Sequence, residues 1–248
     1  ITEKSVPAPY VIDQTPMKAT IKAGETIEVT SRNLRAKGQI IVDKVGKETG
    51  TNLWNEHYSL AGNQFEIHKD KPDGAIVQTI VTNEKGHAET PKSQGDALEL
   101  GTYYVVESKA SNGFVNTFEP IKVELTYENQ TVPLVIQSVK GTNQEVTGEA
   151  ILTKVDKETE EETQGSATFE GAEYTLYYGE DIGTHKLGSP VKWTDNFKPT
   201  VLKGTKSKTP VSKDAVTLVI DKNRQVSVGH LAVGKYFWLE TKAPVGYT

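Results

Sequence analysis

The sequence predicts an all-β protein that is built from short strands packed as sandwiches. Apolar and polar residues alternate over residues 39–45, 75–81 and 215–220, which is typical of strands with one buried face. The 21 glycines and 11 prolines interrupt the chain at short intervals, as turns between such strands require. No long stretch has helical periodicity, so the expected class is a β-sandwich protein.

Composition narrows the classes of function. The chain has 248 residues, enough for about two domains. Its net charge is −5 and it has no long basic run, so nucleic-acid binding is not expected. It has no cysteine, which excludes disulfides, thiolate metal sites and cysteine nucleophiles. No apolar stretch reaches membrane-spanning length, so no membrane insertion is expected in this segment.

The first 36 residues hold two expected strands, near 18–22 and 26–33, with a turn at Ala23-Gly24 between them. Two strands cannot make a core alone. A fuller set of strands begins at Gly38. It has expected turns at 72–74 and 83–86, and its expected strands are 39–45, 65–68, 75–81, 103–107, 121–125 and 131–137.

The pattern starts again at Gly148. An aromatic-rich run follows at 171–180, and a long polar excursion occupies about 181–214. Two strands come after it, at 215–220 and 236–240.

A lysine motif occurs twice. The run VDKVGKETG at 42–50 matches LTKVDKETE at 152–160, and the match pairs Lys44 with Lys154. Each lysine lies six residues after a glycine, Gly38 or Gly148. Self-similarity of this kind indicates tandem repeats of one β module.

A glutamate motif accompanies the lysine motif. Glu107 and Glu240 each end an apolar, aromatic strand, and an aromatic residue follows each of them by seven positions. Glu3 has the same spacing to Tyr10 and is a third copy. We therefore expect residues 1–36 to be the C-terminal strands of a preceding repeat and 37–147 a complete repeat. Residues 148–248 are expected to be a repeat that lacks its last strand and carries the insertion at about 181–214.

The two motifs together predict a specific chemistry. Alternation places Lys44 on one strand face with Val42, and Glu107 on one face with Val105. Burial lowers the pKa of a lysine and raises that of a glutamate, so the amine becomes a nucleophile and the carboxyl a proton donor. A nearby carboxamide would then be attacked, ammonia would leave, and an isopeptide bond would remain. Lys154 and Glu240 are expected to act in the same way, with no metal and no cofactor.

The residue that accepts the amine is less clear from the sequence. Asn33 ends an expected strand five residues before Gly38, and Asn143 has the same spacing to Gly148. An ungapped match from Glu107 points instead to Gln137. Asparagine is the better acceptor on chemical grounds, so Asn143 is preferred and Gln137 stays as the alternate. The acceptor for Lys154 is expected beyond residue 248.

These residues resemble the Cna-B, or SpaA-like, domains of Gram-positive pilins and surface adhesins. The likeness rests on the lysine of LTKVDKETE, the glutamate of YFWLETKAPVGY and the asparagine of TIEVTSRN. The resemblance implies tandem reversed immunoglobulin-like, or prealbumin-like, sandwiches with Lys–Asn or Lys–Asp bonds between first and last strands. It also implies a sortase substrate that is secreted, anchored to the cell wall of a Gram-positive bacterium, and joined to neighbouring pilin or stalk domains.

The resemblance implies a structural role, in a pilus shaft or an adhesin stalk, and not a turnover enzyme. The alternative is a module that binds a host ligand through the 181–214 insertion, where Trp193, Asn196 and Phe197 form a candidate patch. No serine–histidine–aspartate or paired-carboxylate pattern supports a hydrolase. The five histidines lack metal-ligand spacing and are expected at the surface.

Overall fold

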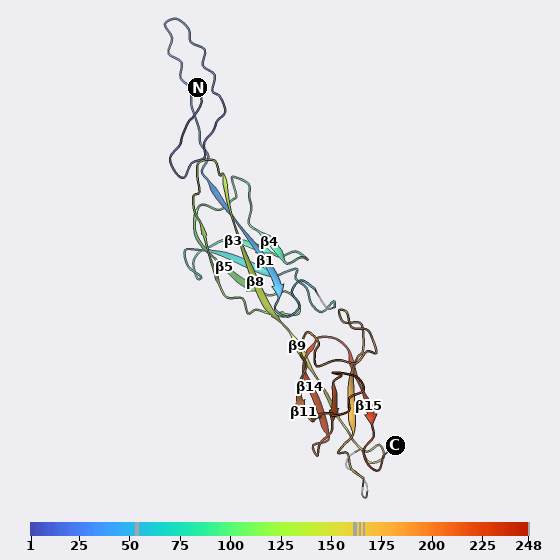
Figure 1. Ribbon diagram of the computed structural model, residues 1–248. Coiled ribbons are helices and arrows are strands. Elements are labelled where there is room, and N and C mark those ends of the chain that lie inside the picture. The colour runs from blue at the N-terminus through green and yellow to red at the C-terminus, as the bar shows by residue number, and fades with distance from the viewer. Residues whose placement is uncertain (53–54, 161–162, 164, 166, 248) are drawn as a thin grey trace. The chain divides into compact units, whose positions relative to one another are not determined.

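The computed structural model describes residues 1–52, 55–160, 163, 165 and 167–247, and every regular element in that part of the chain is a β-strand (Figure 1). The predicted all-β class is confirmed. The first eight strands are β1 (Lys37–Gly46), β2 (Gln64–Lys69), β3 (Ile76–Val81), β4 (His87–Glu89), β5 (Gly101–Lys109), β6 (Phe114–Val115), β7 (Ile121–Leu125) and β8 (Leu134–Glu145). The remaining strands are β9 (Thr147–Thr153), β10 (Glu173–Tyr178), β11 (Thr200–Lys203), β12 (Thr205–Lys206), β13 (Thr217–Val219), β14 (Gln225–Ala232) and β15 (Tyr236–Lys242).

The chain forms two compact units that interleave along the sequence. The first unit comprises residues 1–45, 60–110 and 116–142, and the second comprises 46–59, 111–115 and 143–248. The backbone therefore passes from one unit to the other five times, after residues 45, 59, 110, 115 and 142.

The core of the first unit lies between two sheets. One sheet has the strand order β3-β2-β5-β7, and the other has the order β4-β1-β8-β6. Alternate residues of each strand point inward, so the two sheets contribute to a single cluster of buried side chains. The fully buried members of that cluster include Ile40 and Val42 of β1, Phe65 of β2, and Val105 of β5.

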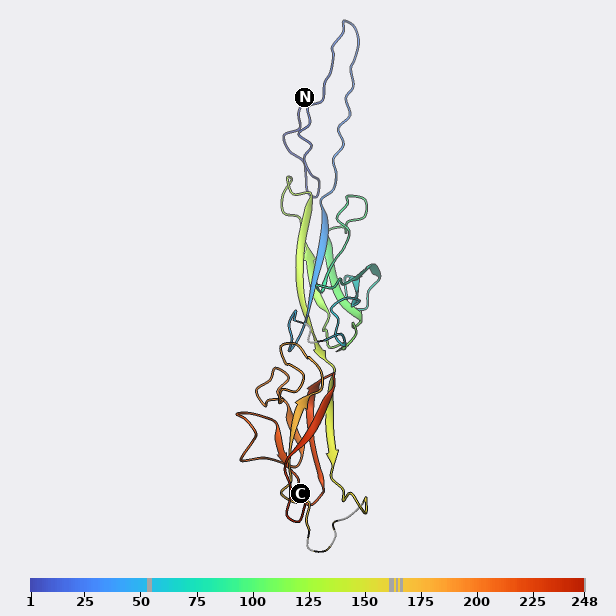
Figure 2. The same ribbon diagram turned by 90° about the vertical axis from the view of Figure 1, so that its right-hand side faces the viewer.

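The second unit contains sheets with the orders β11-β14-β9 and β12-β13-β10-β15. In Figure 2, the red strand β15 runs beside the orange strand β10, and the two pair antiparallel with Tyr174 opposite Glu240. Strand β9 pairs with β14 and has that strand as its only sheet neighbour within the described residues. By contrast, β1 lies between β4 and β8.

Two predicted segments differ in the structure. Residues 18–22 and 26–33 were expected as strands, but no strand is assigned there and Ile21 is 78% exposed. The reason is physical, because two isolated segments bury too little apolar surface to offset the cost of ordering them. Conversely, the polar excursion at 181–214 contains strands β11 and β12, which extend one sheet each by pairing with β14 and β13.

A buried carboxylate organises the loop that follows β1. Glu145 is 2% exposed, and it accepts hydrogen bonds from the backbone amides of Glu48 (3.1 Å) and Thr49 (2.8 Å) and from the Thr49 hydroxyl (2.8 Å). In the same unit, the Tyr58 hydroxyl donates to the carbonyl of Val146 (2.8 Å). Buried donors need such partners, so Glu145 fixes the 46–50 turn.

Replacing Glu145 with alanine should destabilise the second unit. The change leaves two amides and a hydroxyl without their acceptor in a buried place, which costs about 1–3 kcal/mol for each group that water cannot reach. Thermal unfolding followed by circular dichroism measures the loss. Glu170→Ala, an exposed glutamate of the same unit, is the matched control, and equal melting temperatures for the two variants would contradict the role assigned to Glu145.

Candidate functional site: two lysine–glutamate pairs

Lys154 and Glu240 lie together, as the repeated motifs predict. Lys154 follows the end of β9, and Glu240 lies on β15. The Lys154 Nζ atom donates to both Glu240 carboxylate oxygens, at 3.0 and 3.2 Å. The lysine side chain is 12% exposed and the glutamate side chain 34% exposed. The two motifs therefore meet as an ion pair that water still reaches.

Two tyrosines enclose the amine of Lys154. Its Nζ atom donates to the Tyr174 hydroxyl at 3.1 Å, and it lies 5.7 Å from the Tyr174 ring centre and 5.6 Å from that of Tyr247. Tyr247 is itself held in place, because it stacks on Phe169 at 5.6 Å and its hydroxyl donates to Asp156 at 2.9 Å. Ring faces attract cations, so this cage favours the ammonium form.

The charge state of Lys154 follows from these contacts. Burial alone lowers the pKa of Lys154, but the hydrogen bonds and charges of Tyr174 and Glu240 outweigh it, so the pKa lies above the usual 10.5. For Tyr174 burial has the opposite effect and raises the pKa, which keeps its hydroxyl neutral. In this structure Lys154 is thus a paired ammonium, which is not a nucleophile.

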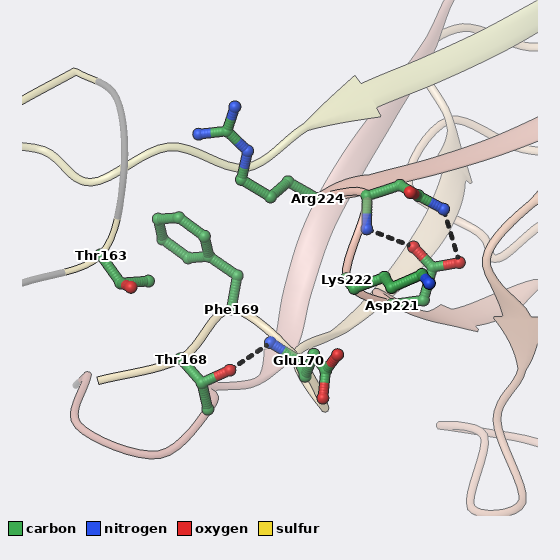
Figure 3. A pocket seen from close by; sticks show the side chains of 8 residues that line it. Thr163, Thr168, Phe169, Glu170, Asp221, Lys222 and Arg224 are labelled. Atoms are coloured by element: carbon green, nitrogen blue, oxygen red, sulfur yellow. Dashed lines mark hydrogen bonds between the residues drawn. The ribbon is translucent and has the colours of Figure 1, made fainter. Parts of the chain in front are cut away.

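A pocket adjoins the Lys154 pair. Figure 3 shows Phe169, Arg224 and Asp221 among the residues that line it. It connects to the pair through Phe169, which stacks on Tyr247, and through the Arg224 carbonyl, which accepts from the Lys154 amide at 2.9 Å. The Asp221 carboxylate accepts from the backbone and side chain of Asn223, at 2.8 and 3.2 Å. The lining carries both signs of charge, so the pocket does not favour a ligand of one sign.

The other motif lysine and glutamate, Lys44 and Glu107, are both buried in the first unit. Lys44 is 0% exposed and Glu107 is 5% exposed. Lys44 is two residues beyond Val42, and Glu107 is two beyond Val105, so each extends a strand face that lines the core cluster. The same motif thus occurs in two environments. It is buried in the first unit and partly exposed to solvent in the second.

The candidate acceptors differ in burial. Asn143 lies on β8, which neighbours β1 in sheet order, and it is 0% exposed. Gln137 lies on the same strand and is exposed. Asn33 lies beside the third glutamate, because its Nδ2 atom donates to Glu3 at 2.6 Å and to the Val11 carbonyl at 3.0 Å. Burial therefore favours Asn143 over Gln137 as a group that could react away from water.

Sequence reasoning missed Tyr174. A signal for it exists, since Tyr174 lies three residues after Gly171 and Phe65 lies three residues after Gly62. Both aromatic residues face the motif glutamate on the neighbouring strand, Tyr174 opposite Glu240 and Phe65 opposite Glu107. The expectation that all histidines are exposed was also wrong, because His68 is 9% exposed and its Nδ1 atom lies 2.9 Å from the Gly74 carbonyl.

The insertion does not present the predicted patch intact. Phe197 is 2% exposed, with its ring centre 6.2 Å from that of Tyr58, and is thus part of the interior. Trp193 is half-buried with the Lys206 amine 4.0 Å from its ring centre, and Asn196 is exposed. Among the described residues, no cluster of three histidine or acidic side chains could hold a metal ion. That part of the chain also has no helix long and apolar enough to cross a membrane.

The Lys154–Glu240 pair should contribute stability that depends on pH. Because the folded pKa of Lys154 is raised, the contribution is fully present below the ordinary value of 10.5 and is lost as pH rises through the folded value. Compared with Lys154→Met, the wild type should be more stable by up to about 1 kcal/mol at neutral pH, since the pair is partly exposed. Urea unfolding at about pH 7 to about pH 11 tests this, with exposed Lys222→Met as control. An advantage that grows with pH would contradict it.

Comparisons with known proteins find a matching domain family and similar structures. The model of the SpaA prealbumin-like fold domain matches residues 38–140. The Bacillus anthracis TIE protein has a similar structure, with a TM-score of 0.55 and 24% identity, over 98% of this chain and 35% of that one. The chain thus spans about a third of that protein's length.

More distant matches are a streptococcal ancillary pilin and the shaft pilin SpaA of Lactobacillus rhamnosus GG. The first has 17% identity and a TM-score of 0.34, over 98% of this chain and 66% of that one. The second has 20% identity and a TM-score of 0.31, over 86% of this chain and 90% of that one. No curated protein sequence matches. The predicted resemblance to SpaA-like domains is confirmed for residues 38–140, which match the SpaA prealbumin-like fold domain.

Proposed function

We propose that this chain is a structural segment of a pilus shaft or adhesin stalk, stiffened by isopeptide bonds that it forms itself. The observation that carries the proposal is the burial of Lys44, Glu107 and Asn143, which are 0%, 5% and 0% exposed. Charged and amide side chains are rarely buried to this degree without a specific role. A lysine, a carboxyl group and a carboxamide in apolar surroundings are the components of an amide exchange.

The proposed bond joins Lys44 to Asn143. The neutral Lys44 amine attacks the Asn143 side-chain carbon, so the Nζ–Cγ bond forms and the Cγ–Nδ2 bond breaks. Glu107, protonated because it is buried, donates a hydrogen bond to the carbonyl oxygen and passes a proton from Nζ to Nδ2. Ammonia leaves and the Glu107 carboxyl is restored, so the exchange needs no other reactant. It happens once per bond, so the chain is not a turnover enzyme.

Such a bond suits a protein that carries load. It would tie β1 to β8, which are neighbours in one sheet, and it would close a loop of about 100 residues. In the chain-entropy model for crosslinks, a loop of that size stabilises the folded state by about 5 kcal/mol. Force along these strands would pass through covalent bonds, and the core would not have to unfold.

We propose an extracellular location at the cell wall of a Gram-positive bacterium, with neighbouring pilin or stalk domains as partners. The match of residues 38–140 to the SpaA prealbumin-like fold domain supports this location. The host-binding alternative, through the 181–214 insertion, has less support. Its candidate patch loses Phe197 to the interior, and its strands complete the sheets of the second unit.

The intact mass of the purified protein tests the bond. The wild type should be lighter than its sequence by one ammonia for the Lys44–Asn143 bond. Lys44→Ala and Asn143→Ala should each have the full sequence mass and a lower melting temperature, consistent with a loss of several kcal/mol.

Gln137→Ala is the matched control, because it removes a carboxamide from the same strand and should keep the mass deficit. A full sequence mass for the wild type would overturn the proposal. A deficit that persists in Asn143→Ala and disappears in Gln137→Ala would move the bond to Gln137.

A further inference from the structure

The two lysine–glutamate pairs differ at one position that neither motif contains. On β10, Tyr174 lies opposite Glu240, whereas on β2 the residue opposite Glu107 is Phe65. The two aromatic rings are alike in size, and only the tyrosine carries a hydroxyl. Any difference that this position makes must therefore act through a single oxygen atom.

The Tyr174 hydroxyl oxygen contacts the Lys154 Nζ atom, which is the atom that would react. The Tyr174 hydroxyl lies 3.1 Å from the Lys154 Nζ atom, while Nζ lies 3.0 Å from Glu240. Tyr174 is 7% exposed, so most of this residue is shielded from solvent. A lysine ammonium has three donors, and two of them are thus fixed by side chains from β10 and β15.

The other groups around the amine also favour its charged form. Tyr247 presents its ring face at 5.6 Å, and Asp156 holds the Tyr247 hydroxyl at 2.9 Å. Strand β14 and the turn before it contribute the Arg224 carbonyl, which bonds to the Lys154 backbone amide. The Glu240 carboxylate, the Tyr174 hydroxyl and the Tyr247 ring thus interact with the Nζ atom, whereas the Arg224 carbonyl holds the backbone of Lys154.

We propose that Tyr174 is a positioning residue that holds the Lys154 ammonium beside the Glu240 carboxylate and so keeps this amine protonated and unreactive. Phe65 has no hydroxyl and cannot do the same for Lys44. The inference rests on the bond chemistry proposed above. For Lys154 to react, one proton must move from Nζ to a Glu240 oxygen, which leaves a neutral amine and a neutral carboxyl group. The Tyr174 hydroxyl opposes that transfer because it accepts a stronger hydrogen bond from an ammonium than from an amine.

Competitive labelling with trace acetic anhydride tests this role in the full chain. Acetylation of Lys154 is measured by peptide mass spectrometry from about pH 7 to about pH 11, because only the neutral amine reacts. The midpoint of this profile reports the protonation of Nζ and is independent of steric access. In Tyr174→Phe the pH midpoint of Lys154 acetylation should fall, and the acetylation rate should reach its high-pH plateau at a lower pH. Near pH 8 the labelling should rise about threefold to tenfold, the effect of losing one hydrogen bond.

The control is Tyr177→Phe, three residues along the same strand, where the ring stacks on Phe237 at 5.3 Å. It should leave the Lys154 profile unchanged, and Glu240→Gln should lower the midpoint further than Tyr174→Phe.

An unchanged midpoint in Tyr174→Phe would overturn the proposal. So would a wild-type midpoint for Lys154 no higher than that of exposed Lys222, a result that needs no variant. The mass deficit at Lys44 is read separately, so failure of the bond chemistry is distinguishable from failure of this role.

Discussion

Burying an amine and a carboxyl group in an apolar sandwich is the constraint on which the rest of the first unit depends. Lys44 and Glu107 are fully or almost fully buried, and they occupy strand faces that also carry Val42 and Val105. Leaving a charge in such a place is costly. The two groups can lower that cost by sharing a proton or by making a covalent bond. The proposed isopeptide bond would remove the charged amine permanently and would turn an unfavourable feature of the core into a crosslink.

The two copies of the pair show how strongly the neighbouring strands set its chemistry. In the first unit the strand that carries Lys44 has a sheet neighbour on each side, and both members of the pair lie in the core. In the second unit β9 has a single sheet neighbour among the described residues, and the Glu240 side chain is 34% exposed. Water, Tyr174 and Tyr247 then stabilise the charged pair. Similar motif residues are therefore fully buried in one setting, where we propose that they react, and form a partly exposed salt bridge in the other.

Much of this arrangement could be predicted from the sequence, since it depends on local patterns. The alternation in 39–45 predicts β1 and the inward direction of Lys44, and the glycine spacings identify Lys154 and Glu240 as a pair. Other features depend on distant partners, which no local pattern contains. Asn143 is buried and Gln137 is exposed although both lie on β8, a difference that the local sequence does not show. The hydroxyl of Tyr174 acquires a role because β10 brings it to Lys154.

The interleaved order of the two compact units limits how the protein can be divided. Residues 46–59 and 111–115 belong to the second unit but are flanked on both sides by residues of the first. No single cut in the backbone separates the chain into two complete units, because any fragment that contains all of one also carries pieces of the other. A protease that cuts one loop between residues 60 and 110 would leave each fragment with residues of both units, so neither fragment would carry a complete unit.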